Sequence, residues 1–250
     1  MYLSVSYKIV VPQFLKWLLN VFFPRTCAGC RGDVPWGEEH ALCAACRDAL
    51  PRWVGWACIV CDLPLPDGGA RCPDCRRRRR AFRYLRSALL YEGAAGKIIK
   101  AFKFGGRQDL AGPLGRIVSD RWREEPRLGP ADLVVPVPLH WRRERSRGYN
   151  QAAALARVFA GQTGLPMRAD VLKRRRATKP QTSLGREDRR ENVREAFVVR
   201  RPEAVRGKTV LLVDDVCTTG ATLEACARAL KKSGARRVGA ITAARQAPFK

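Results

Sequence analysis

The sequence has no long apolar run and no secretory signal. Lys8 and Lys16 interrupt the apolar clusters near the start, and no run approaches the roughly 20 apolar residues that a membrane-spanning helix needs. No small-residue cleavage site precedes Pro24. We therefore expect no stable membrane span and a cytoplasmic location. Residues 14–23 should form a helix that packs on the body of the protein, with peripheral membrane contact as the alternative.

Acidic residues are also few. The chain holds 48 Lys and Arg against 23 Asp and Glu, a formal net charge of +25. Residues 1–80 carry +5 and residues 81–250 carry +20. Such a surface attracts polyanions, whether nucleic acid, anionic lipid or pyrophosphate, although for any single basic run a solvated surface in an arginine-rich sequence is the simpler explanation. Few aromatics accompany the basic runs outside Trp141 and Tyr149, so the stacking surface expected of a dedicated single-strand binder is small.

Cysteines, by contrast, are numerous and regularly placed. Eight of the ten form four Cys-x-x-Cys pairs with the spacing of zinc ribbons: Cys27 with Cys30, Cys43 with Cys46, Cys58 with Cys61, and Cys72 with Cys75. Two such turns can point four thiolates at one metal, so we expect two structural Zn²⁺ sites with no open position for catalysis. Disulfides would use the same cysteines, but no secretory signal supports an oxidising compartment. Sequential sites are favoured over a cross-braced arrangement, because each then closes its own short loop.

Cys217 and Cys226 stand apart from these pairs. Cys226 is spaced to pack as a small hydrophobe on the apolar face of a helix. Cys217 lies near a helix N-terminus, which would lower its pKa, and a catalytic thiol is the minor alternative there.

Strands and helices alternate after residue 81, as in a parallel α/β sheet. The patterns predict strands at residues 87–91, 133–137, 210–213 and 238–243, and helices at residues 95–104, 110–122 and 151–159. The basic segment 174–194 lacks periodicity, and a long loop of this kind in a compact domain is more often a functional lid than filler. The predicted fold class is α/β, with an N-terminal helix over residues 1–24, a double zinc ribbon over 25–80 and a parallel-sheet domain over 81–250.

Residues 210–222 carry the most informative motif: a buried strand, two carboxylates, and a Thr/Gly loop that leads into an amphipathic helix. The hydroxyls and backbone N–H groups of residues 218–222 would lie at the positive end of the helix dipole, where a phosphate fits. Gly220 permits a close backbone approach that a side chain would block. Asp214 and Asp215 can bind vicinal ribose hydroxyls directly or through Mg²⁺. The pattern therefore indicates a site for a phosphorylated sugar.

This motif resembles the phosphoribosyl pyrophosphate (PRPP) signature of type I phosphoribosyltransferases, with Ala221 where relatives often place Ser. With the cysteine pairs, further segments resemble the ComF/GntX family: KIIKAFKFGGR at residues 97–107, PVPLH at 136–140, RGYNQ at 147–151, KPQTSL at 179–184 and RREN at 189–192. The resemblance covers nearly the whole chain from Pro24 on and implies a type I phosphoribosyltransferase fold. Members of the family are associated with DNA uptake during natural competence.

The resemblance also implies roles for individual residues. The PRPP-binding residues would be Asp214, Asp215, Val216, Cys217, Thr218, Thr219, Gly220, Ala221 and Thr222, with Arg142, Arg143 and Arg147 of a pyrophosphate-binding loop over residues 140–147. Lys179 and Arg189, on a catalytic flap, would join the two aspartates as catalytic residues. An active enzyme would displace pyrophosphate from C1 of PRPP with a nitrogen nucleophile, through positioning and charge stabilisation, with Mg²⁺ on the leaving group. No general base stands out, since His140 suits a phosphate donor or a surface residue better.

Three functions are compatible with these features. The preferred one is a PRPP-binding protein that serves DNA uptake and holds single-stranded DNA on its basic surface. The second is an active phosphoribosyltransferase on a base or amine, which steady pyrophosphate release would favour. The third is an interaction module that docks a competence translocase or helicase through its zinc ribbons. PRPP-independent partner binding would favour the third, and a DNA affinity that falls steeply with salt would favour the first.

Overall fold

The computed structural model describes residues 12–22, 25–34, 41–125, 129–175 and 196–247. The elements run in the order α1 (Gln13–Phe22), α2 (Ala44–Asp48), α3 (Pro73–Arg77), β1 (Tyr84–Leu90), α4 (Gly93–Phe104), η1 (Gln108–Leu110), α5 (Ala111–Arg123), β2 (Leu133–Pro136), α6 (Trp141–Arg147), α7 (Gln151–Thr163), β3 (Leu172–Arg174), β4 (Phe197–Val199), η4 (Pro202–Ala204), β5 (Thr209–Cys217), α9 (Ala221–Lys232) and β6 (Arg237–Arg245). The predicted α/β class is confirmed.

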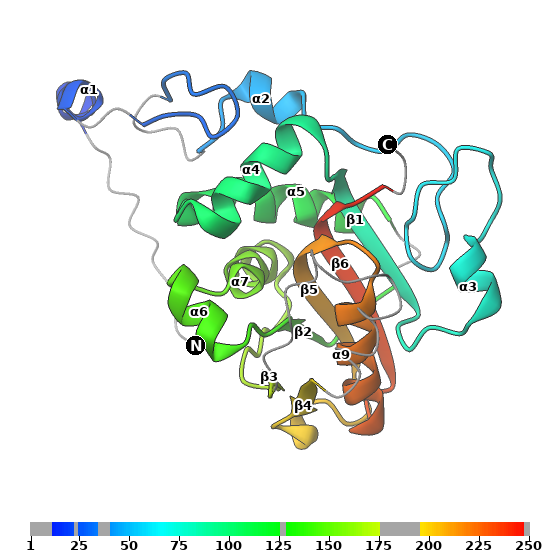
Figure 1. The fold of residues 1–250 in the computed structure, drawn as a ribbon. Helices are drawn as coiled ribbons and strands as arrows, with labels where there is room; N and C mark the ends of the chain where they lie inside the picture. The colour runs from blue at the N-terminus through cyan, green and yellow to red at the C-terminus, as the bar shows by residue number, and fades with distance from the viewer. Residues whose placement is uncertain (1–11, 23–24, 35–40, 126–128, 176–195, 248–250) are drawn as a thin grey trace.

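Four parallel strands form the central sheet, in the order β1-β6-β5-β2 (Figure 1). Such strands are buried on both faces and need helices on both sides. Helices α4, α5 and α7 lie on one face, and α9 covers the other (Figure 1). Because all four strands run the same way, their carboxyl ends meet at one edge of the sheet, where the segments that follow β2 and β5 are neighbours.

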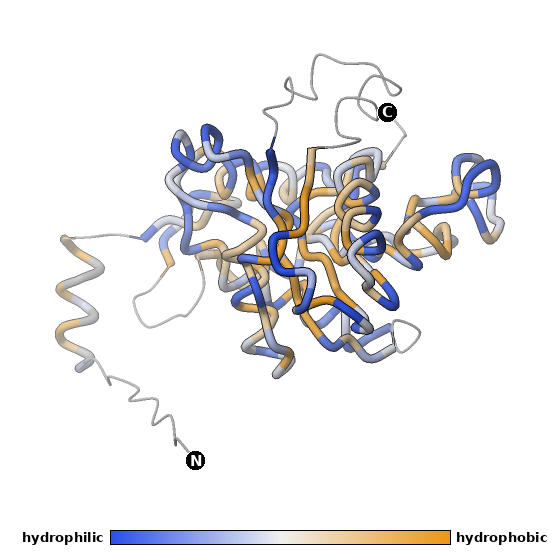
Figure 2. The backbone as a smooth tube through the Cα atoms, turned by 90° about the horizontal axis from the view of Figure 1, so that it is seen from below, coloured by the Kyte–Doolittle hydropathy of each residue, from blue (hydrophilic) through white to orange (hydrophobic). Residues whose placement is uncertain are grey.

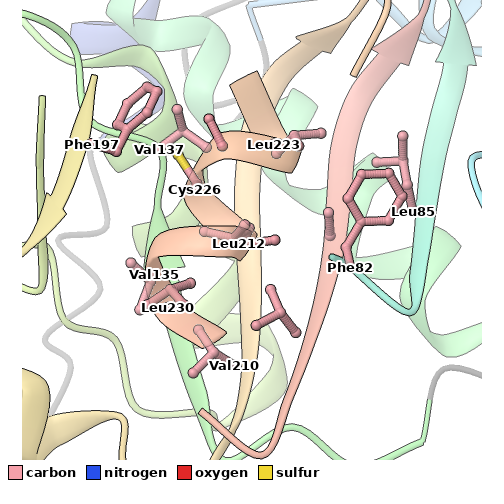
Figure 3. Close-up of a cluster of buried hydrophobic side chains, with 14 of the residues drawn as sticks. Phe82, Leu85, Val135, Val137, Phe197, Val210, Leu212, Leu223, Cys226 and Leu230 are labelled. Atoms are coloured by element: carbon pink, nitrogen blue, oxygen red, sulfur yellow. The ribbon is translucent and has the colours of Figure 1, made fainter. Parts of the chain in front are cut away.

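Alternating side chains along β5 divide the core into two clusters. Val210 and Leu212 pack with α9 (Figure 3). Leu211 and Val213 belong to the cluster on the side of α4, α5 and α7. The same alternation continues through the next two residues of the strand, so the two carboxylates of the motif project from opposite faces of β5.

Each cysteine-rich ribbon joins a different side of this core. The first ribbon, which contains α2, packs with the cluster on the α4 side, and the second, which contains α3, packs with the cluster on the α9 side. The second ribbon also covers the outer edge of β1. The backbone N–H of Leu85 donates to the carbonyl of Val60 at 2.8 Å, and that of Ser87 donates to the carboxylate of Asp62 at 2.7 Å. An exposed strand edge is thereby avoided.

Helix α1 forms where the sequence predicts it, but it does not pack on the body of the protein. Phe14 is 70% exposed, Trp17 60% and Phe22 69%, and the helix stands apart from the sheet in Figures 1 and 2. Apolar periodicity predicts a helix and its apolar face, but it does not predict which other part of the protein packs against that face. The described residues provide no such surface, and they include no helix long and apolar enough to cross a membrane.

Three other elements differ from the prediction. Residues 140–147, expected as a loop, contain α6, which His140 caps by accepting a hydrogen bond from the N–H of Arg142. Strand β5 continues through both aspartates to Cys217, because its pairing with β6 extends that far. The antiparallel pair β3 and β4 was not predicted, since its strands have only three residues each. The predicted flap, with Lys179 and Arg189, lies outside the described residues.

Candidate functional site

The loop between β5 and α9 turns at Gly220. This residue has a φ of 76°, a left-handed conformation that residues with a side chain rarely adopt. Thr219 Oγ1 accepts a hydrogen bond at 3.3 Å from the N–H of Ala221, the first residue of α9. The amides of a first helical turn have no carbonyl partners within their own helix, and the positive end of the helix dipole lies there too. A phosphate is the ligand that this arrangement suits.

The two carboxylates of β5 have different surroundings. Asp215 is 8% exposed, and its Oδ1 lies 2.9 Å from Nζ of Lys103 on α4. Asp214 accepts a hydrogen bond at 2.8 Å from the backbone N–H of Asp215. Burial, and then the charge of Asp215, raises the pKa of Asp214 to about 8. Asp214 therefore holds a proton at neutral pH in the free protein, and a cation bound beside it would release that proton.

Lys103 is a site residue that sequence reasoning missed. Burial alone would lower the pKa of its ammonium group, but Asp215 and Asp214 raise it overall, so the group stays charged. A signal was present in the sequence, because Lys103 lies in the segment 97–107 that carries the family resemblance. It is the next-to-last residue of α4, which ends at the carboxyl edge of the sheet. The lysine places a cation in direct contact with the carboxylate pair.

The raised pKa of Asp214 should make the stability of the protein depend on pH. Its pKa is about 8 in the folded protein against an ordinary value of 3.8, so between these pH values only the folded state holds the proton. This stabilising contribution is fully present below about pH 4 and is lost as the pH rises through about 8. Asp214→Asn should abolish the decline, so that between pH 5.5 and pH 8 its stability relative to wild type rises by about 3 kcal/mol. Urea unfolding at both pH values measures the difference, and parallel pH profiles would contradict the expectation.

Arg245, also missed, connects the β5–α9 loop to the second ribbon. It is the last residue of β6, is 4% exposed, and lies opposite Cys217 in the strand register. Its Nη1 donates to the carbonyl oxygen of Thr218 at 2.9 Å and contacts Cys217 Sγ. Its Nη2 lies 4.0 Å from Cys61 Sγ. One buried guanidinium therefore bridges the loop and a predicted zinc ligand.

The cysteines outside the pairs are buried. Burial raises the pKa of Cys217, although Arg245 acts in the opposite direction. The lowered pKa expected from a helix N-terminus is therefore wrong, and a catalytic thiol is not favoured there. Cys226 is fully buried on α9, where burial also raises its pKa, and it packs as a small hydrophobe as predicted.

The arginines predicted to bind pyrophosphate lie on α6, which follows β2 at the carboxyl edge of the sheet. The guanidinium of Arg147 lies 4.7 Å from the ring centroid of Phe104, so it reaches the end of α4 that carries Lys103. Arg142 instead lies over the ring of Trp141, at 5.3 Å. The structure thus brings Arg147 toward the carboxylate pair and directs Arg142 to an aromatic neighbour.

His140 and Arg143 lie at the start of the same helix. His140 is 5% exposed, and its Nδ1 accepts the N–H of Arg142 at 3.3 Å. Burial, with the charges of Arg174, Arg142 and Arg143, lowers the pKa of the imidazole. Burial and then Arg147 lower the pKa of Arg143 as well. A neutral histidine whose nitrogen caps a helix is poorly placed to act as a general base.

The cysteine pairs gather into two tetrads, in each of which the Sγ atoms lie within 4.8 Å of one another: Cys27, Cys30, Cys43 and Cys46 in the first, Cys58, Cys61, Cys72 and Cys75 in the second. The arrangement is sequential, as predicted, and all ten cysteines are free of disulfides. Backbone N–H groups of Gly29 and Gly32 lie 3.4 Å from cysteine sulfurs of the first tetrad, which suits negatively charged ligands. The residues fit two closed four-thiolate zinc sites.

Known proteins share both halves of this arrangement. A double zinc ribbon domain matches residues 18–76, and a phosphoribosyl transferase domain matches residues 145–247. DNA utilization protein YhgH of Salmonella typhimurium is 31% identical over 86% of this chain and 94% of its own length. The chain belongs to the ComF/GntX family. Competence protein F of Haemophilus influenzae is 29% identical over 87% of this chain and 95% of its own. Competence protein ComFC of Bacillus subtilis is 28% identical over 81% and 85%.

The two matched domains of this ComF/GntX protein contain most of the candidate residues. The ribbon match contains all eight paired cysteines. The transferase match contains the carboxylate pair, the β5–α9 loop, Arg147 and Arg245. Arg142 and Arg143 on α6 and Lys103 on α4 lie outside both matches, and only the folded chain brings Lys103 to Asp215.

Proposed function

We propose that this ComF/GntX protein binds PRPP with Mg²⁺ at the carboxyl edge of its sheet and serves DNA uptake, with nucleic acid held on its basic surface. The β5–α9 loop beside two carboxylates carries the PRPP part of the proposal. The DNA part is supported by the names of relatives, DNA utilization protein and competence protein, and by the net charge of +25. Two tetrads without disulfides suit a reducing compartment, and the cytoplasm is the location we propose.

In this proposal different residues of the site bind different parts of PRPP. Residues 218–222 bind the 5′-phosphate, and Asp214 and Asp215 bind the ribose hydroxyls. Mg²⁺ would neutralise charge on the pyrophosphate when it is bound. Lys103 lies beside Asp215, and Arg147 reaches the same end of α4 over the ring of Phe104, so these two cations would contact the pyrophosphate.

An active phosphoribosyltransferase is the second candidate, favoured by the intact loop and carboxylate pair. The bond from C1 to the pyrophosphate oxygen would break, a bond from C1 to a base or amine nitrogen would form, and pyrophosphate would leave as an anion. The proton of the nitrogen would pass to solvent, since His140 is occupied as a helix cap. Steady pyrophosphate release with an acceptor would establish this activity. A zinc-ribbon module for a translocase or helicase, the third candidate, would bind its partner without PRPP.

Calorimetry with PRPP and Mg²⁺ tests the proposal. Zinc-loaded wild type should show saturable binding, and Asp214→Asn/Asp215→Asn should bind at least about 30-fold more weakly, about 2 kcal/mol, because the sugar and the cation lose their carboxylates. Asp67→Asn/Glu203→Gln makes the same two carboxyl-to-amide replacements at exposed positions and should bind like wild type. Equal weakening in both variants, or no binding by folded, zinc-loaded wild type, would overturn PRPP binding.

A further inference from the structure

A basic groove lies at the amino edge of the sheet, away from the β5–α9 loop. It has a volume of about 370 Å³ and forms where the second ribbon meets the starts of β1 and β6 and the end of α9. Of the 13 described residues that line it, eight are Arg or Lys and none is Asp or Glu. Seven of these cations are exposed and come from three different segments: Arg71, Arg78, Arg79, Arg83, Lys231, Arg236 and Arg237.

Few of these charges are neutralised within the protein. Arg80 and Arg78 share one carboxylate, that of Asp74, at 2.9 Å and 3.5 Å. Arg236 lies 3.6 Å from Asp132. Within the part of the chain that the structure describes, no carboxylate forms an ion pair with the four remaining arginines: Arg71, Arg79, Arg83 and Arg237. Cations gathered this closely repel one another, and a bound polyanion would remove the repulsion.

We propose that this groove binds the phosphate backbone of nucleic acid, a site that rests on the nucleic-acid part of the proposed function. Eight cations exceed what a single phosphate can contact and suit a chain of repeating phosphates. The aromatic residue of the lining, Phe82, is 1% exposed, so its ring is not presented for stacking on a base. Contact through phosphates alone predicts binding without sequence preference and with a steep dependence on salt.

The groove and the proposed PRPP site can be occupied together. In the register of β5 with β6, Thr209 pairs with Arg237 at the groove end and Cys217 pairs with Arg245 at the loop end. Each strand has nine residues, so the two ends lie about 26 Å apart. Nucleic acid in the groove would therefore leave the β5–α9 loop open to a sugar phosphate.

Fluorescence anisotropy with a labelled single-stranded oligonucleotide of mixed sequence tests the groove. Arg79→Glu/Arg83→Glu/Arg237→Glu should weaken binding at least about 30-fold and reduce the slope of log affinity against log salt by about 2. Lys97→Glu/Lys100→Glu/Arg157→Glu makes the same charge change at exposed positions on α4 and α7, across the sheet from α9 (Figure 1), and should weaken binding less than about threefold. Saturating PRPP and Mg²⁺ should change the oligonucleotide affinity of wild type less than about twofold.

Three other results would overturn the proposal that the groove binds nucleic acid. Equal weakening in the two triple variants would show that net charge alone attracts DNA. Unchanged binding by the groove variant would place the DNA elsewhere. Polyglutamate that competes more strongly than the oligonucleotide, and loses its binding only in the groove variant, would assign the groove to an acidic protein. Calorimetry with PRPP on the groove variant separates the two proposals, because a folded variant should keep whatever PRPP binding wild type has.

Discussion

Replacing Cys61 and Cys72 with serine is expected to lower the midpoint of thermal unfolding of the whole protein by more than about 10 °C, or about 3 kcal/mol for a chain of this size. The second tetrad is at most 5% exposed and belongs to the same buried cluster as Phe82 and Leu85. Loss of its zinc would unfold the ribbon and uncover the edge of β1. Thermal unfolding followed by circular dichroism, with zinc content measured in parallel, checks this expectation.

Substitutions in the first tetrad provide the matched control for this prediction. Cys30 is exposed, and Cys43 and Cys46 are only partly buried. Cys30→Ser/Cys43→Ser should therefore lower the midpoint by less than about 5 °C, since less packed surface depends on this ribbon. Each double variant should lose one zinc of two. Equal shifts would contradict the difference in packing, and a variant that kept both zinc ions would contradict the ligand assignment.

Arg245→Met should weaken PRPP binding at least about tenfold while both zinc ions stay bound. The guanidinium fixes the start of the β5–α9 loop by donating to the carbonyl of Thr218, and methionine fills similar space without a donor. Its Nε is buried and has no hydrogen-bond partner among the residues that the structure describes, so the substitution also removes an unsatisfied polar atom and should cost little stability. PRPP calorimetry, zinc content and thermal unfolding of the same sample separate these effects.

Two further variants make the Arg245 result specific. Arg245→Lys keeps the charge, but one ammonium cannot reach both Thr218 and Cys61, so an intermediate affinity is expected. Arg157→Met removes an exposed arginine of α7 and should bind PRPP like wild type. Wild-type affinity in Arg245→Met would show that the loop holds its shape without the guanidinium. Loss of zinc from that variant would show that the arginine supports the ribbon instead.

Local patterns in the sequence predicted much of this molecule. The buried strand, the carboxylate pair and the Thr/Gly loop follow one another along the chain, so their order predicted β5 and the start of α9. The spacing of the cysteine pairs predicted the partners in each tetrad, because sequential pairing closes short loops. Features that depend on residues close together in the sequence could therefore be predicted from the sequence.

Lys103 and Arg245 show where such inference ends. Arg245 contacts Cys61 across 184 residues, and this pairing exists only because β6 lies beside both β1 and β5. Lys103 reaches Asp215 only once α4 has packed on the sheet. Helix α1 marks the same limit, since its pattern predicted an apolar face but not whether anything covers it. These contacts depend on the register of the strands and on how the helices pack on the sheet. A local sequence pattern predicts neither.

The place of β6 in the sheet has a consequence for the order of events during synthesis. Of the strands that the structure describes, β6 is the last to leave the ribosome, yet it lies between β1 and β5, so the sheet cannot close until β6 has been made. The second ribbon precedes β1 directly and requires only short loops and a metal to fold. A second ribbon that folds on its zinc at this stage would therefore cover the outer edge of β1 before β6 can pair with the other edge.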